Sequence, residues 1–376
     1  MISMRLFGAR PNQRCIGDGC FSLRRGDRWR RAQAVQAGCQ RLNLDSLLFP
    51  GHLAGYRIVK TDAPAKYRIS GHESFACRYT WLPKSVRGLK ANPALFSDEE
   101  KAMVDLGVGK NMVRSIRFWS QASGVITASA KGCGHSVTEF GQALLGEGGF
   151  DPFMEDIRTL WLFHWNLATN RQNPLLAWDF LLNRWQEPEL IPSTVVSALQ
   201  KEVAKSDEGP SLVTIDQHWD TFLHSYFPTR GRKGDVQEDN LDSPLTELTL
   251  IIRIGERPLD RPEGRAESIY AFRREDKPEI TPELFIYALD DFWNERHSGE
   301  KTLSFRQVAH GHGSPGQVFK IPEHDVRDRL DSISKATGGF FSFSDSSQVP
   351  VVTRNGEIES IDLLSDIFEK EGRIWQ

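Results

Sequence analysis

Six consecutive residues, Leu160 to Trp165, are apolar on every side when they are written as a helix, apart from His164. A helix without a polar face has to be buried all round, so other apolar elements must surround this segment. Helical patterns continue beyond it, up to a helix that carries Trp219 and Tyr226. We therefore expect a wholly helical middle region, in which His164 is a core side chain rather than a ligand.

The chain of 376 residues is too long for one compact core. We predict a mainly α, multi-domain fold with winged helix-turn-helix modules and a helical middle region. The net charge of −3 means that any DNA contact has to come from local basic patches. The expected parts are a basic, disordered tail at 1–65, a winged helix-turn-helix domain at 66–150, a helical middle domain with an acidic segment at 151–275, and a C-terminal winged-helix-like domain at 276–376.

The first 65 residues are rich in arginine and glycine and show no sustained helical or strand period. We interpret them as a disordered arm or as coding sequence upstream of the true start; an arm that holds phosphates is the alternative. The five cysteines lack the paired spacing of a zinc site. The sequence shows neither a secretory signal nor an apolar run of about 18 residues, which predicts a cytoplasmic protein without membrane contact.

One stretch of the N-terminal half shows the order of elements found in a winged helix. Helical spacing begins at Trp81 and ends before Pro93, and a capping box of Ser97 and Glu100 starts a second helix. A third helix spans about 110–122, and two short strands separated by a glycine-rich loop follow it. Three helices followed by a hairpin predict a winged helix-turn-helix.

The third of these helices divides into an apolar face and a cationic face. Lys110, Arg114 and Arg117 recur at i, i+4 and i+7 and share one side of the helix, with Asn111 and Gln121 nearby. A recognition helix needs one face that holds it to its domain and another that offers cations to phosphates and forked donors to base edges. We predict DNA contact here; the alternative is an ordinary solvated helix face.

The C-terminal hundred residues repeat the modular pattern. N-cap signals stand at Thr281 and Ser304, and a longer helix is followed by a phenylalanine-rich hairpin. Arg327 and Arg329 on that helix are offset by neighbouring aspartates. We therefore expect this second winged-helix-like module to contact protein rather than DNA.

Several motifs stand in order from about residue 68 to residue 376. They are Gly71-His72-Glu73-Ser74-Phe75, Trp81-Leu82-Pro83-Lys84, Leu106-Gly107-Val108-Gly109-Lys110, Asp151-Pro152-Phe153, Glu238-Asp239-Asn240-Leu241-Asp242 and Gly313-Ser314-Pro315-Gly316. Together they resemble one bacterial family, the SspB-type DNA nickases that accompany DNA phosphorothioation gene clusters. The N-terminal tail lies outside the resemblance.

This resemblance implies a magnesium-dependent nick in double-stranded DNA, made as part of phosphorothioation-based modification and antiviral defence. It also implies the partners of such systems, namely a cysteine desulfurase, a sulfurtransferase that uses ATP, and an ATPase. The resemblance does not assign catalytic residues, so these have to be inferred from their chemistry.

Glu238, Asp239 and Asp242 form an acidic segment that we predict to bind magnesium and to carry catalysis. Mg²⁺ prefers carboxylates and keeps several waters, so two or three acids suffice. The metal would form hydroxide and shield the charge that develops on phosphate oxygens. The alternative is that Asp242 or Ser243 simply caps the helix that follows and that the acids favour its positive N-terminal end. A basic loop that could hold a phosphate precedes them, at Arg230, Arg232 and Lys233.

His72 and Glu73, with Arg78, form a second candidate site. The histidine could serve as general base or metal ligand, the glutamate as ligand, and the arginine as a clamp on the DNA phosphate. The alternative is that these residues form a buried group of hydrogen-bonded polar side chains, which holds the strand at the start of the domain in place. His310 and His312 are two further histidines in a glycine loop, which we interpret as loop residues.

Two other functions fit the same patterns. The chain could be a non-catalytic DNA-binding subunit that recruits the sulfur-transfer proteins. It could also be a transcriptional regulator, a function that explains a winged helix but leaves the long buried helical middle without a purpose.

Overall fold

The computed structural model describes residues 67–129, 134–204, 210–228, 243–258, 266–345, 349–356 and 360–368. The chain divides into two units, residues 1–62 and residues 63–376. All described residues belong to the second unit, so the predicted basic tail at 1–65 lies outside them. The domain boundaries that we expect at 150 and 275 fall inside this second unit and stay predictions.

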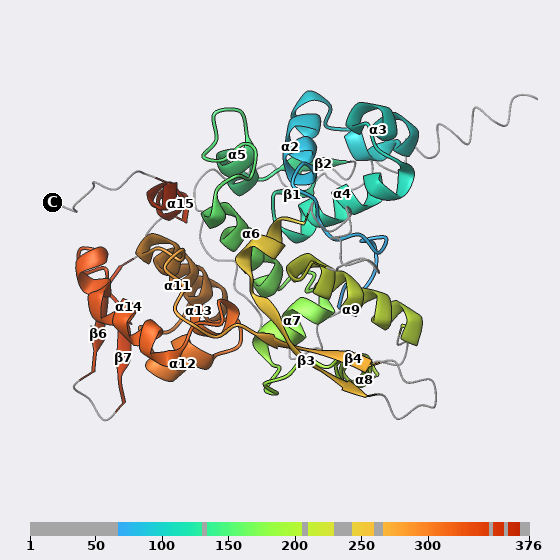
Figure 1. Ribbon diagram of the computed structural model, residues 1–376. Helices are drawn as coiled ribbons and strands as arrows, with labels where there is room; N and C mark the ends of the chain where they lie inside the picture. Colours follow the sequence, from blue (N-terminus) through green and yellow to red (C-terminus); the bar gives the residue numbers. More distant parts are fainter. Residues whose placement is uncertain are drawn as a thin grey trace, which may run out of the picture. The chain divides into compact units, whose positions relative to one another are not determined.

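The first part of this unit contains helices and one short hairpin, in the order expected from the sequence (Figure 1). The N-cap of α3 is Asp98, whose side chain accepts hydrogen bonds from the backbone of Glu100 and Lys101; the predicted cap at Ser97 is therefore wrong by one residue. Strands β1 and β2 pair antiparallel. The elements are α2 (Trp81–Ala91), η1 (Leu95–Ser97), α3 (Glu99–Leu106), α4 (Lys110–Ala122), β1 (Ile126–Ala128), β2 (His135–Val137) and α5 (Glu139–Leu145).

The middle part is mostly helical, but its second half corrects the expectation of a wholly helical region. Strands β3 and β4 form a long antiparallel hairpin with a bulge between Arg253 and Gly255. Ile251 pairs with Phe272 and Ile252 with Ala271, and the isoleucines of β3 are a strand signal that we missed in the sequence. The elements are α6 (Ile157–Thr169), α7 (Leu176–Asn183), α8 (Pro192–Val203), α9 (Leu212–Tyr226), η2 (Pro244–Leu248), β3 (Ile251–Pro258) and β4 (Ala266–Phe272).

Helix α6 is buried, as its sequence requires. His164 is fully buried within it and lies in a chain of hydrogen bonds. The indole of Trp178 donates to the hydroxyl of Tyr226 at 3.1 Å, this hydroxyl donates to Nδ1 of His164 at 2.8 Å, and Nε2 of His164 donates to the carbonyl of Val318 at 3.0 Å. Every partner is satisfied, which confirms His164 as a core side chain.

The C-terminal part combines helices with a three-stranded antiparallel sheet in the order β5-β7-β6. The predicted N-caps at Thr281 and Ser304 are confirmed, and Ser304 forms a complete capping box with Gln307. Strand β5 was not expected from the sequence. The elements are α11 (Pro282–Arg296), β5 (Thr302–Ser304), α12 (Phe305–His310), α13 (Pro315–Val318), α14 (Glu323–Ala336), β6 (Phe341–Ser344), β7 (Val351–Arg354) and α15 (Ser360–Phe368).

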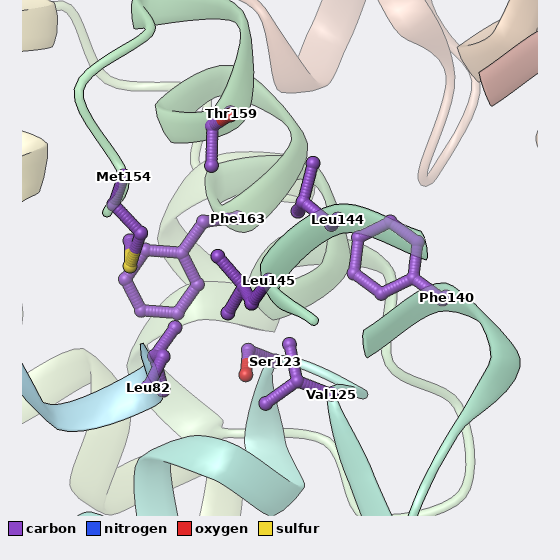
Figure 2. A pocket seen from close by; sticks show the side chains of 9 residues that line it. All are labelled: Leu82, Ser123, Val125, Phe140, Leu144, Leu145, Met154, Thr159 and Phe163. Carbon is purple, nitrogen blue, oxygen red and sulfur yellow. The ribbon is translucent and has the colours of Figure 1, made fainter. Parts of the chain in front are cut away.

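A small cavity lies between α2, α5 and α6 (Figure 2). Its volume of about 10 Å³ gives room for one water molecule at most. Apolar side chains such as Leu82, Leu145 and Phe163 line it, and the buried hydroxyl of Thr159 at its edge has no partner among the described residues. The cavity is a packing defect of the core and too small for a ligand. None of the described helices is long and apolar enough to cross a membrane.

Candidate nucleic-acid interface

Helix α4 is held to the molecule by its apolar face, as expected. Val113, Ile116 and Trp119 are buried, and the indole of Trp119 donates to the carbonyl of Phe75 at 3.0 Å. Contacts of this kind fix which side of α4 faces outward. The cationic face is therefore the side that a bound ligand would meet.

Two of the three predicted cations on that face are neutralised by Glu99 of α3. The guanidinium of Arg114 donates to both carboxylate oxygens of Glu99, at 2.8 and 3.1 Å, and the ammonium of Lys110 lies 3.3 Å from the same group. The charge of Glu73 also acts on Arg114. The spacing alone suggested three free cations on this face, but Lys110 and Arg114 are both paired with Glu99. Asn111 stays exposed.

Arg117 has a different environment from the other two cations. No carboxylate of the described residues forms an ion pair with it, and its positive charge acts on Arg68. Arg68 lies with its guanidinium 4.0 Å from the centre of the Phe118 ring and donates to the side chain of Gln121 at 3.5 Å. Burial and the positive charge of Arg117 lower the pKa of Arg68 to about 10.

His135 of strand β2 completes this group. The amide of Gln121 donates to Nε2 of His135 at 2.8 Å, so Nδ1 of the ring carries the proton and has no partner among the described side chains. Burial and the charge of Arg117 lower the pKa of His135. We call Arg68, Arg117, Gln121 and His135 the arginine cluster.

The arginine cluster has the chemistry of an anion site. Two guanidinium groups repel each other without a compensating carboxylate, and a phosphate between them would relieve that repulsion. The cluster joins the C-terminal half of α4 to the hairpin, which in Figure 1 lies beside that helix. The spacing of α4 indicated Arg117 and Gln121, but Arg68 and His135 come from other segments and were missed.

The second predicted site centres on His72, which is 4% exposed. The backbone N–H of Ser74 donates to Nδ1 at 3.1 Å, so the ring proton is on Nε2, which lies 3.2 Å from the carbonyl of Ile69 and 3.1 Å from Nδ1 of His218. Burial lowers the pKa of His72 to about 4 and that of His218 well below its usual value. Both rings are neutral and internal, a geometry that disfavours the predicted role of His72 as a catalytic base.

The other members of that site face different partners. Glu73 lies near Arg114, and its backbone has a positive φ of 49°. The guanidinium of Arg78 lies 5.6 Å from the centre of the Trp81 ring. The catalytic role predicted for Glu73 and the phosphate clamp predicted for Arg78 stay predictions.

The acidic segment with Glu238, Asp239 and Asp242 lies outside the described residues, as does the basic loop with Arg230, Arg232 and Lys233. Ser243, the first described residue after it, is buried, donates to the carbonyl of Ser225 at 3.0 Å and precedes η2. Within the described ranges, no group of three or more His, Cys, Asp or Glu is placed to hold a metal. The described part alone thus offers no magnesium site to which a reaction step could be assigned.

Asp179 and His312 form a pair that the sequence did not indicate. Nε2 of His312 donates to the buried carboxylate of Asp179 at 2.7 Å, and the same carboxylate accepts from Tyr67 and Arg184 at 3.1 and 3.0 Å. Burial opposes ionisation of Asp179, but the hydrogen bond and charge of His312, together with the charge of Arg184, outweigh it and hold its pKa below the usual value. From the sequence we interpreted His312 as an ordinary loop residue, but its side chain is hydrogen-bonded to a residue of α7.

The chain is similar to one protein family and to two crystal structures of a known protein. The family model described as a protein of unknown function, DUF4007, matches residues 69–368. A magnesium ion-bound crystal structure of SspB shares 26% identity with a TM-score of 0.67, and covers 79% of this chain and 85% of that chain. Another SspB crystal structure shares 25% identity with a TM-score of 0.66 and the same coverage. A search of curated protein sequences gives no significant match. These similarities confirm the resemblance inferred from the motifs.

Proposed function

Since the chain belongs to the DUF4007 family, whose function is unknown, we propose a function from its geometry: it binds duplex DNA through α4 and the β1–β2 hairpin. The observation that carries this proposal is the pair of Arg68 and Arg117, two neighbouring guanidinium groups that no described carboxylate neutralises. Phosphates of the DNA backbone are the anions that such a pair suits best.

The order of elements around the cluster supports the same interpretation. Helices α2, α3 and α4 followed by an antiparallel hairpin have the sequence of elements of a winged helix-turn-helix. In that arrangement α4 takes the place of the recognition helix, and the hairpin takes the place of the wing. A phosphate held by Arg117 and His135 would then lie where the helix and the wing meet.

We further propose that the chain nicks one strand of the bound DNA and acts in phosphorothioation-based modification and antiviral defence. Support comes from the similarity to SspB, one structure of which contains magnesium, and from the acids Glu238, Asp239 and Asp242. Magnesium, when bound, would supply charge shielding at the phosphate. In this proposal the partners are a cysteine desulfurase, a sulfurtransferase and an ATPase.

DNA binding is tested by fluorescence anisotropy with a labelled duplex at several salt concentrations. Replacing Arg117 with Gln removes one phosphate contact, so we expect about tenfold weaker binding and a slope of log K against log salt that is smaller by about 0.9. Lys101→Ala is the matched control, because it removes one exposed cation from the neighbouring helix. Equal effects of the two changes would contradict the proposed interface.

Nicking is tested by conversion of supercoiled plasmid to open circles with magnesium and with EDTA. We expect open circles that require the metal, and their loss in the triple variant Glu238→Gln, Asp239→Asn, Asp242→Asn while DNA binding persists. Nicking that survives in this variant would show that other residues carry the reaction.

The second candidate function is a DNA-binding subunit without nuclease activity that recruits the sulfur-transfer proteins. The same arginine cluster favours it, because DNA binding by Arg68 and Arg117 needs no metal. Tight, salt-dependent binding without any plasmid relaxation in magnesium would establish this alternative. A transcriptional regulator would in addition show strong preference for one duplex sequence.

A further inference from the structure

An open cleft of about 520 Å³ lies where the end of α7, the segment after β4 and the α12–α13 region meet. Figure 1 shows α12 and α13 far from α4, so the cleft is separate from the arginine cluster. Its volume lies within the usual range of ligand sites. The lining is more polar than apolar, and its members include Trp185, Arg274, Arg306, Gln307, His310 and Gln317.

The cleft contains two arginines that no described carboxylate neutralises. Neither Arg274 nor Arg306 forms an ion pair with a described residue. The acids that follow Arg274 in the sequence are used elsewhere: Glu275 binds Arg273 at 3.1 Å, and Asp276 binds His324 at 2.7 Å. The positive charge at this end of the cleft is therefore uncompensated.

Two amide side chains in the cleft add hydrogen-bond donors. Gln317 is 5% exposed yet lines the cleft, and its side chain makes no hydrogen bond to another described residue. The oxygen of Gln307 is occupied by the backbone and hydroxyl of Ser304, at 2.8 and 2.7 Å, which leaves its NH₂ group available. The amide of Gln317 therefore has hydrogen-bonding capacity that a ligand in the cleft can use.

A buried lysine next to the cleft residue Arg274 responds to the charge of that arginine. Lys320 is fully buried, donates to the carbonyl of Leu182 at 2.5 Å, and feels the charge of Arg274. Burial and that charge lower the pKa of Lys320 well below its ordinary value. The carboxylate of Glu323 is hydrogen-bonded to His310, a residue of the cleft lining. The charges of Arg274 and Arg306, which no described carboxylate neutralises, thus favour an anion over a cation in the cleft.

We propose that this cleft binds a phosphate ester, with Arg274 and Arg306 pairing with its charge and the amides of Gln307 and Gln317 donating to its oxygens. Free nucleotides and nucleic-acid strands share this chemistry, and both fit an open cleft. The proposal does not depend on DNA binding at α4.

The experiment is calorimetric titration of the full chain with AMP and with a short single-stranded oligonucleotide. Tighter binding of AMP would identify a free nucleotide as the source of the phosphate. Tighter binding of the oligonucleotide would identify a strand if it persists in Arg117→Gln and is lost in Arg306→Gln. We expect Arg306→Gln and Arg274→Gln each to weaken binding by about tenfold, and Gln317→Glu to abolish it through charge repulsion.

Two controls keep this result separate from the proposed DNA interface. Lys301→Ala removes an exposed cation from the same C-terminal part, and Arg117→Gln removes one from the arginine cluster; neither is expected to change AMP binding. The proposal is overturned if neither probe binds, or if Arg274→Gln and Arg306→Gln bind like the unaltered chain while circular dichroism shows that they are folded.

Discussion

Glu99 holds Arg114 through both carboxylate oxygens, at 2.8 and 3.1 Å, and it also lies 3.3 Å from the ammonium of Lys110. The hydrogen bond from Arg114, together with those two charges, lowers the pKa of Glu99 to about 2, so the carboxylate is ionised at any physiological pH. One acid on α3 therefore forms ion pairs with two of the three cations on the outer face of α4.

The first prediction is that Glu99→Gln strengthens DNA binding. The change frees Lys110 and Arg114 to contact phosphates, so we expect affinity to rise several-fold at moderate salt. The slope of log K against log salt should steepen by up to about 1.8, the value for two further phosphate contacts. Anisotropy titrations with one duplex measure both quantities.

Glu100→Gln is the matched control, because Glu100 is an exposed acid on the same helix and its removal changes the net charge equally. An equal gain in both variants would mean that only the overall charge matters. In that case Lys110 and Arg114 do not reach the DNA.

The second prediction concerns acid stability and rests on three buried histidines. Burial lowers the pKa of His72 to about 4 and of His164 to about 3, and that of His218 falls well below its usual value. In the unfolded chain the three titrate near 6.5. Below that pH the unfolded chain binds more protons than the folded one, so stability is complete above pH 6.5 and is lost as the pH falls.

Each of these histidines should remove roughly 1 kcal/mol from the free energy of unfolding between pH 6.5 and 5.5, or about 3 kcal/mol for the three. Urea unfolding at pH 7.5, 6.5 and 5.5 measures this loss. His324→Ala removes an exposed histidine and should leave the pH dependence almost unchanged. A free energy of unfolding that stays level down to pH 5.5 would show that the three rings are not buried in solution.

Local signals predicted the helices well because caps act within a few residues. The pairs Thr281 with Leu284 and Ser304 with Gln307 are satisfied inside one helical turn, so the sequence contains everything needed to find them. Where two capping residues are adjacent, the sequence does not decide between them, and Asp98 rather than Ser97 caps α3.

The candidate sites depended on contacts that no local pattern contains. The periodicity of α4 placed Lys110, Arg114 and Arg117 on one face, but it carried no information about Glu99, which another helix brings to them. Arg68 reaches Arg117 from a segment before the first described helix. Helical spacing reports which residues share a face, while the charge that a ligand meets depends on tertiary neighbours.

The third prediction is that Asp179→Asn destabilises the chain. The buried carboxylate accepts from Tyr67, Arg184 and His312, and an amide loses the charge that strengthens two of these bonds. Arg184 keeps Glu202 at 2.7 Å, so its guanidinium is not left alone. We expect a loss of about 2–3 kcal/mol, measured by urea unfolding at pH 7.5.

Asp216→Asn serves as the comparison, because Asp216 is exposed on α9 and should change stability little. If Asp179→Asn is no more destabilising than Asp216→Asn, the contact between α7 and the loop with His312 does not contribute to the fold.

The last prediction concerns the close approach of α12 and α13 at Gly316. A Cβ atom at this position would lie 2.5 Å from the carbonyl oxygen and 2.8 Å from Cα of Ala309, both backbone atoms that cannot turn aside. Gly316→Ala should therefore force α13 away from α12 and lower the free energy of unfolding by about 1–3 kcal/mol, as other overpacked sites do. Gly299→Ala meets no atom within 4 Å, so its free energy of unfolding in urea should stay close to that of the parent.

Because α12 and α13 also supply Gln307 and Gln317, the same displacement of α13 in Gly316→Ala should weaken AMP binding in the cleft. If Gly316→Ala is as stable as the parent, α12 and α13 are less closely packed than the 2.5 Å between the added Cβ atom and the carbonyl oxygen of Ala309 implies.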